Sequence, residues 1–238
     1  MVPPFSLVIP AFNEANRIGD TLAEVLAYLR RESPESELIV VNDGSTDATA
    51  GVIEGALAAA DPIATQLITH SPNRGKGAAV RDGMLAASRP IGLFSDADLS
   101  TPITETPKLI EPIARGDIDV AFGSRALNRK LIGNRQPWRR EQGGRVFNLL
   151  VRLSTGLPFW DTQCGFKAFR LEVSRNIFTQ SQVAGFGFDV ELLFLARRAG
   201  LRMREIPVRW NHCEGSKVHF LRDSVAMLRE VISLRASS

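Results

Sequence analysis

Two carboxylates separated by one residue close a short apolar run in the segment FSDADLS, residues 94–100. Alternate residues of an extended segment point to the same side, so Asp96 and Asp98 can both reach one ion or its bound ligand. A Mg²⁺ or Mn²⁺ that also contacted a diphosphate would screen these carboxylates from each other and from the phosphate oxygens. The structural alternative is a solvated turn or a helix cap, because the pair precedes Pro102.

Three other polar clusters follow apolar runs in the first half of the chain. Asn13 and Glu14 follow the first run, Asp43 lies in an N-D-G-S segment after the second, and Lys76 lies between two glycines after the third. Asp43 is suited to contact a base or a ribose, and a lysine between glycines lets backbone and ammonium approach a ligand closely. The glycine spacing matches neither a Walker A loop nor a dinucleotide fingerprint, which argues against an ATPase or a dinucleotide-dependent dehydrogenase.

The elements that must position these residues alternate between strand and helix patterns. Short apolar runs bounded by turn residues predict strands at residues 6–10, 37–42, 63–69, 91–95 and 117–123. Helical spacing of apolar residues fills the intervals between them. Such alternation predicts an α/β fold with a mostly parallel central sheet flanked by helices. The carboxyl ends of parallel strands form a ligand-binding edge, so we expect the four polar clusters to meet there.

Length and composition are those of one folded unit. The 238 residues are 44% hydrophobic and 23% charged, which is enough to bury a sizeable core, and no repeat, low-complexity segment or linker divides them. We therefore expect a single domain over residues 1–238, with a nucleotide half at about residues 1–100 and an acceptor half at about residues 101–238.

Charge is unevenly distributed, although the net charge is only +3. Residues 125–152 contain many Lys and Arg and a single acid, Glu141, so this stretch should attract an anion. Two cysteines and the lack of a secretory signal pattern before the first strand predict a cytoplasmic protein. No apolar run approaches the roughly 18 residues that cross a bilayer, so membrane contact would be peripheral. We expect no nucleic-acid partner, and a homo-oligomer is compatible with the sequence.

Two segments are both amphipathic and basic, residues 145–157 and residues 218–234. Packing on the sheet is the common fate of one such helix. We expect at least one of them to lie on a bilayer surface instead, if the substrate has a lipid tail. Trp138, Phe159 and Trp160 would then either anchor the protein at the interface or belong to the core.

A family resemblance is carried by an ordered set of motifs that spans about residues 6 to 234. The motifs are VIPAFNEANRI, VVNDGSTDAT, NRGKGAAVRDGML, SDADLSTP, FGSR, DTQCGFKAFR, FDVELLFLARRAG and EGSK. The set resembles the family 2 glycosyltransferases of GT-A fold and, more narrowly, the polyprenyl- or dolichyl-phosphate sugar synthases. DTQCGFK, FDVELL and EGSK are most similar to the dolichyl-phosphate glucosyltransferase branch. The resemblance implies transfer of a sugar, with inversion, from a nucleotide sugar to the phosphate of a long isoprenoid lipid.

The same resemblance assigns roles to individual positions. It implies a nucleotide pocket that contains Pro10, Ala11, Asn13, Glu14 and Asp43, and a Mg²⁺ or Mn²⁺ held by Asp96 and Asp98. Lys76, between its two glycines, is a further substrate-binding candidate from the residue pattern. Where relatives of the mannosyl branch carry a glutamine that can complete the metal shell, this chain has Ser100, a weaker ligand. The groups facing the acceptor phosphate and the departing diphosphate would be Arg125, Arg139, Arg140 and Lys217, with Gln163, Lys167 and Ser216 as further acceptor-side residues.

The chemistry of the acceptor decides whether a general base is needed. A phosphate monoester has a second pKa of about 6 and arrives largely ionised. A sugar hydroxyl would instead need a carboxylate to take its proton, and Asp189 is the candidate for that base or for orienting the sugar. Its structural alternative is an N-cap of the helix that begins near residue 188. UDP-glucose is the favoured donor. A GDP-mannose donor, a soluble or glycan acceptor, and a non-catalytic nucleotide-sugar binding module are the alternatives.

Overall fold

The computed structural model describes residues 1–134, 138–213 and 230, and of residues 138–141 and 145 it describes the helical backbone alone. Its described strands form one seven-stranded sheet in the order β3-β2-β1-β4-β6-β5-β7. The strands are β1 (Ser6–Ala11), β2 (Glu37–Asn42), β3 (Ala64–Thr69), β4 (Ile91–Ser95), β5 (Val120–Ser124), β6 (Phe166–Arg170) and β7 (Met203–Pro207).

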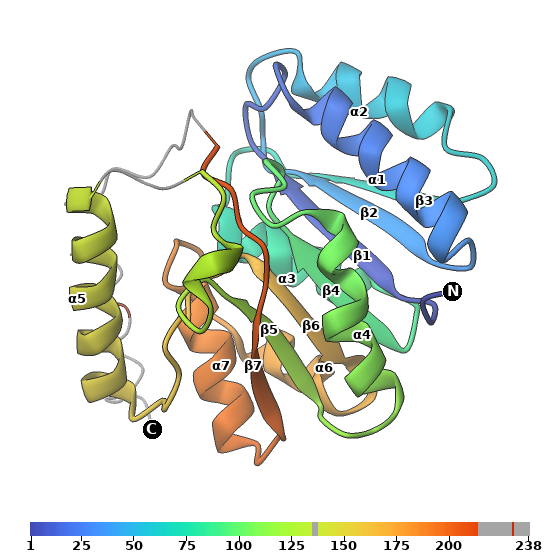
Figure 1. The fold of residues 1–238 in the computed structure, drawn as a ribbon. Helices are drawn as coiled ribbons and strands as arrows, with labels where there is room; N and C mark the ends of the chain where they lie inside the picture. The colour runs from blue at the N-terminus through green and yellow to red at the C-terminus, as the bar shows by residue number, and fades with distance from the viewer. Residues whose placement is uncertain (135–137, 214–229, 231–238) are drawn as a thin grey trace.

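Helices cover both faces of this sheet (Figure 1). They are α1 (Ile18–Glu32), α2 (Thr49–Ala58), α3 (Lys76–Ala86), α4 (Thr106–Ala114), α5 (Trp138–Thr155), α6 (Leu171–Gln180) and α7 (Phe188–Arg198), with short 3-10 turns η1 (Ile103–Glu105) and η2 (Arg129–Leu131). Successive strand residues point to opposite faces, so Leu7 and Ile9 enter the core under α1 and α4, whereas Val8 enters the core under α3, α6 and α7. The two apolar clusters hold the three layers together.

Strand direction confirms the predicted, mostly parallel α/β sheet. β1 pairs in parallel with β2 and β4, β2 with β3, and β5 with β7. β6 is antiparallel to both of its neighbours, β4 and β5. The five predicted strands correspond to β1–β5 to within a few residues, whereas β6 and β7 were not predicted. β6 was missed because its second residue is Lys167, a charged residue inside a buried strand.

Helix α5 corresponds to the first predicted amphipathic segment, and it is two-faced. Phe147 and Val151 are buried in the core beside α7, whereas Leu149 and Leu153 are exposed. None of the helices in the described residues combines the length and apolarity that a membrane crossing requires. The second predicted amphipathic segment, residues 218–234, lies outside the described residues except for Glu230.

Candidate active site

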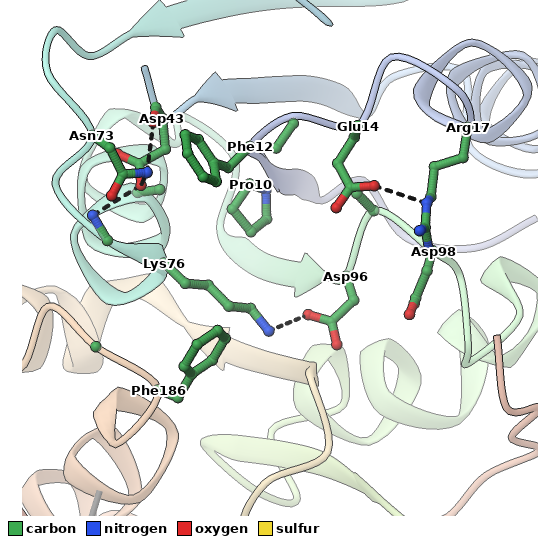
Figure 2. Close-up of a pocket in the computed structure, with 15 residues that line it drawn as sticks. Pro10, Phe12, Glu14, Arg17, Asp43, Asn73, Lys76, Asp96, Asp98 and Phe186 are labelled. Carbon is green, nitrogen blue, oxygen red and sulfur yellow. Dashed lines mark hydrogen bonds and ion pairs between the residues drawn. The ribbon is translucent and has the colours of Figure 1, made fainter. Parts of the chain in front are cut away.

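A cavity of about 420 Å³ opens at the carboxyl ends of β1, β2 and β4 (Figure 2). Most of its wall comes from the four polar clusters that the sequence places after strands, and the rest comes from the loop before α7. The clusters therefore meet at one edge of the sheet, as predicted. The predicted site residues in this wall are Pro10, Ala11, Glu14, Asp43, Lys76, Asp96 and Asp98.

Asp96 and Asp98 lie in a turn at the end of β4. The backbone N–H of Leu99 donates to the carbonyl of Asp96 at 3.2 Å, and Leu99 adopts a left-handed φ of 45°. The Asp98 carboxylate accepts a hydrogen bond from the backbone N–H of Ser100 at 2.9 Å. Asp96 and Asp98 therefore do form a turn, as the structural alternative expects. Both residues also line the cavity wall, where Asp96 points at Lys76 (Figure 2).

The carboxylate of Asp96 has an incompletely satisfied oxygen and packs against a glycine. Its Oδ1 is buried and, apart from an ion pair with Lys76 Nζ at 2.6 Å, makes no hydrogen bond of normal geometry. Gly165 lies directly against this carboxylate, and a Cβ at that position would overlap both oxygens. Two carboxylates are hard oxygen donors of the kind that Mg²⁺ and Mn²⁺ accept. Among the described residues no group of three or more His, Cys, Asp or Glu is arranged for a metal, so Asp96 and Asp98 would share the ion with phosphate or water oxygens.

Lys76 begins α3 and projects its ammonium into the cavity beside Asp96 (Figure 2). Burial by itself lowers the pKa of Lys76, but Asp96 and Asp189 outweigh it and hold that pKa above its usual value, so the side chain is a cation. The flanking glycines are required by packing. Gly75 has a φ of 96°, and a Cβ on Gly75 or Gly77 would strike the backbone of residues 183–184.

Asp43 closes the opposite end of the cavity after β2. Its carboxylate accepts hydrogen bonds from the backbone N–H groups of Arg74 and Gly75, each at 2.9 Å, and from the side chain of Asn73 at 2.8 Å. Asp43 therefore fixes the loop that leads into Lys76. Its predicted contact with a base or ribose stays a prediction.

Two further residues from the first motif, Asn13 and Glu14, are held by contacts of their own. The side chain of Asn13 is not part of the cavity wall; its Oδ1 accepts from the backbone N–H of Thr46 at 2.8 Å. The backbone N–H of Asn13 donates to Ser45 Oγ at 3.0 Å. Glu14 is in the wall and is paired with Arg17 at 2.8 Å.

Comparison with known proteins identifies the family. The sequence model of glycosyl transferase family 2 matches residues 6–178. The chain belongs to glycosyl transferase family 2. It is 40% identical over 227 residues to a dolichyl-phosphate beta-glucosyltransferase of Drosophila melanogaster. The aligned region covers 90% of this chain and 68% of the fly protein. Proteins of the same name from Saccharomyces cerevisiae and Homo sapiens are each 34% identical, over 97% and 90% of this chain and 73% and 69% of their own lengths.

A solved structure supports the fold of this glycosyltransferase. Glucosyl-3-phosphoglycerate synthase from Mycobacterium tuberculosis, crystallised with Mn²⁺, UDP and glucosyl-3-phosphoglycerate, aligns with a TM-score of 0.67 at 22% identity. The alignment covers 98% of this chain and 79% of the other. The expected GT-A architecture is therefore confirmed.

Arg125, predicted on the acceptor side of the glycosyltransferase, lies outside the cavity wall. Its guanidinium makes two parallel hydrogen bonds to Asp161, at 2.7 and 2.8 Å, and stacks over Trp210 at 5.6 Å. Burial raises the pKa of Asp161, but the guanidinium outweighs it and holds that pKa below its usual range. Gln163 is also outside the wall, and its backbone N–H donates to Asp161 at 3.3 Å.

Asp189 is buried beneath the cavity and does not line it. Its carboxylate accepts a hydrogen bond from Lys167, a fully buried side chain whose ammonium also donates to the carbonyl of Cys164 at 2.6 Å. Burial is the main cause of a raised pKa at Asp189. The capping alternative is wrong, because the N-cap of α7 is Gly187 and no side chain caps it.

Four predicted acceptor-side positions cannot be compared with the structure. Ser216 and Lys217 lie outside the described residues, as do the side chains of Arg139 and Arg140. The residues of the cavity wall that were not predicted as site residues are Phe12, Arg17, Asn73, Gly75, Ala79, Ala97, Gly185 and Phe186. Asn73 and Gly75 carry a sequence signal, since they belong to the cluster around Lys76. Phe186 carries none, because it arrives from a loop about ninety residues after the last strand-end cluster.

Proposed function

We propose that this glycosyltransferase moves glucose from UDP-glucose to a polyprenyl or dolichyl phosphate. One observation carries the proposal: Asp96, Asp98 and Lys76 converge in a cavity at the carboxyl ends of the strands, where charged groups can hold a diphosphate. The names of the similar fly, yeast and human proteins support glucose as the sugar and dolichyl phosphate as the acceptor.

Divalent metal dependence is part of the proposal. A Mg²⁺ or Mn²⁺ held by Asp96 and Asp98 would offset the charge that builds on the departing nucleoside diphosphate. Lys76 supplies a second positive charge within reach of the same oxygens. Lys76 is paired with Asp96 at 2.6 Å, so a cation held by Asp96 would compete with this ammonium and would leave it available to the phosphates.

Recognition of the acceptor is assigned to the second half of the chain. Except for Gly185 and Phe186, the cavity wall comes from residues 10–98, which supports the division into a nucleotide half and an acceptor half. Asp161 uses two of the N–H groups of Arg125, and a guanidinium has five, so Arg125 keeps donors for a phosphate. Arg139, Arg140, Gln163, Ser216 and Lys217 complete the proposed acceptor side.

An ionised phosphate attacks without a general base. The place of Asp189 accords with that acceptor better than with a hydroxyl, because its buried carboxylate does not line the cavity where it would have to take a proton. Asp189 is therefore proposed to neutralise the buried Lys167 rather than to take a proton from the acceptor.

We propose that the protein lies peripherally on the cytoplasmic face of a membrane, where it can reach the lipid acceptor. The outer face of α5 exposes Val146, Leu149 and Leu153, and the exposed Trp160 lies against Arg152 at 4.1 Å. Apolar groups beside basic ones are suited to an anionic bilayer surface.

Vesicle flotation tests this surface. Wild-type protein should float with vesicles of phosphatidylcholine, phosphatidylglycerol and polyprenyl phosphate, and Leu149→Glu/Leu153→Glu should not. Val173→Glu, at an exposed valine of α6, is the matched control and should float like wild type. Equal flotation of all three proteins would remove the proposed role of α5.

A transfer assay tests the function itself. Labelled UDP-glucose, Mn²⁺ and polyprenyl phosphate should give a labelled lipid product, and Asp98→Asn should abolish it while the fold is kept. Asp117→Asn, at an exposed carboxylate paired with Arg115, is the control and should retain transfer. Transfer only from GDP-mannose, transfer only to a hydroxyl acceptor, or binding without turnover would each replace the proposed function by one of its alternatives.

A further inference from the structure

His70, the residue after β3, is buried and bridges two carboxylates. Its Nδ1 lies 2.7 Å from Asp43 Oδ1, and its Nε2 lies 3.0 Å from Asp82 Oδ2. Ionised carboxylates can only accept hydrogen bonds, so both ring nitrogens are placed to donate. The ring therefore spans the gap between Asp43 and Asp82.

The ring completes the set of donors around Asp43. A carboxylate offers about four lone-pair sites. At Asp43 the ring of His70 and the backbone of Arg74 use Oδ1, whereas the backbone of Gly75 and the side chain of Asn73 use Oδ2. Asn73 and Gly75 belong to the cavity wall, so the orientation of this one carboxylate sets the shape of that wall (Figure 2).

The other end of the bridge is tied to α3. Asp82 lies in that helix and also accepts from Arg74 at 2.7 Å and from Arg81 at 3.3 Å. The charged groups that face the ring or its partners are therefore Asp43, Asp82, Arg74 and Arg81. The imidazole connects the end of β2 to the helix that begins with Lys76, and the loop between these two anchors carries the cavity residues.

We propose that His70 is a positioning residue for the nucleotide sugar. It does not line the cavity; it orients Asp43, which fixes residues 73–75 and, through them, Lys76. The inference rests on the proposed function, because it assigns the nucleotide to this cavity. A histidine that served stability alone would change the melting temperature when replaced, but not the affinity for the nucleotide at a temperature where the variant is folded.

His70→Gln is the informative variant, since a carboxamide donates at one end only and presents a carbonyl oxygen to the other carboxylate. Loss of a hydrogen bond to a charged group changes an equilibrium constant by roughly tenfold or more. Titration calorimetry with UDP and Mn²⁺ should show a Kd raised about tenfold, and KM for UDP-glucose should rise in parallel while kcat stays within about twofold. Asp82→Asn leaves the contact between His70 and Asp43 in place, so it should raise the Kd for UDP by a smaller factor. This variant replaces His70→Gln in the test if His70→Gln does not fold.

Two comparisons separate positioning from stability. His70→Gln/Asp43→Asn should bind UDP no more weakly than Asp43→Asn alone, because His70 acts through Asp43. Asp119→Asn removes a buried carboxylate that is paired with Arg170 and Arg202 outside the cavity wall, so it should lower the melting temperature and leave the Kd unchanged.

The inference is overturned if His70→Gln and Asp82→Asn bind UDP like wild type, or if the double variant shows additive losses. Failure of wild-type protein to bind UDP with Mn²⁺ is a different result, because it refutes the proposed function and this inference with it.

Discussion

Replacing Lys167 by methionine should destabilise the protein strongly, because it leaves Asp189 without its partner. Lys167 is the second residue of β6 and is fully buried; its ammonium lies 5.5 Å from the centroid of the Phe94 ring and is paired with Asp189. Removing one member of a buried ion pair costs about 3–5 kcal/mol. Total stabilities are about 5–15 kcal/mol, so the loss is a large fraction of the whole. At about 2–4 °C per kcal/mol for a chain of this size, the melting temperature should fall by roughly 6–20 °C.

The loss should depend on pH with a definite sign. Burial already raises the pKa of Asp189, and without the ammonium it is raised further. A carboxyl whose folded pKa lies above its unfolded value binds its proton more tightly in the folded state. The penalty is therefore absent well below the unfolded pKa of about 3.9 and grows as the pH rises above it. The difference between Lys167→Met and wild type should be smaller at pH 5 than at pH 8.

Chemical denaturation followed by circular dichroism measures both effects, and a second variant supplies the control. Lys167→Met/Asp189→Leu removes both charges and should recover most of the lost stability. It should also retain transfer to polyprenyl phosphate. A stable Lys167→Met protein, or a double variant no more stable than the single one, would refute the reasoning. Restored stability without transfer would assign Asp189 a direct catalytic role.

Three further predictions concern the surroundings of the cavity. Gly165→Ala puts a methyl group where the Asp96 carboxylate lies, so kcat/KM for UDP-glucose should fall by about 10²-fold while the melting temperature changes little; unchanged kinetics would contradict this. Burial raises the pKa of Cys164 to about 12, so Ellman's reagent at pH 8 should leave it unmodified in native protein and should modify the half-buried Cys213; two reactive native thiols would be the contrary result. The lowered pKa of Asp161 means that its contribution to stability is present above about pH 4 and is lost as the pH falls through the folded pKa. Wild type should therefore lose more stability between pH 5 and pH 3 than Asp161→Asn, as measured by urea denaturation, and equal losses would show that the ion pair has no effect.

The first half of the fold could be predicted because its strands are short, apolar and bounded by turns. β2 and β4 were predicted with the bounds that the structure has. The strands of the second half could not be predicted in this way. β6 contains the charged Lys167, and the residues of β7 do not alternate between apolar and polar. The local pattern does not show that the lysine in β6 is neutralised by Asp189 of α7, twenty-two residues later in the chain.

The donor side of the site followed from one topological rule. Asp43, Lys76, Asp96 and Asp98 were predicted together because each follows a strand, and all four line one cavity. Phe186 was missed because its place depends on tertiary contacts of its loop. Glu191 of α7 holds the start of that loop through the side chain of Ser181 and the backbone of residues 182 and 183. Such contacts leave no mark on the local sequence.

The most direct test of the account is a crystal structure with UDP-glucose and Mn²⁺, recorded at the manganese absorption edge. The account predicts one anomalous peak in contact with the carboxylates of Asp96 and Asp98 and with the diphosphate, and a Lys76 ammonium that has left Asp96 for a phosphate oxygen. Nucleotide bound away from this cavity, or manganese that contacts neither carboxylate, would contradict it.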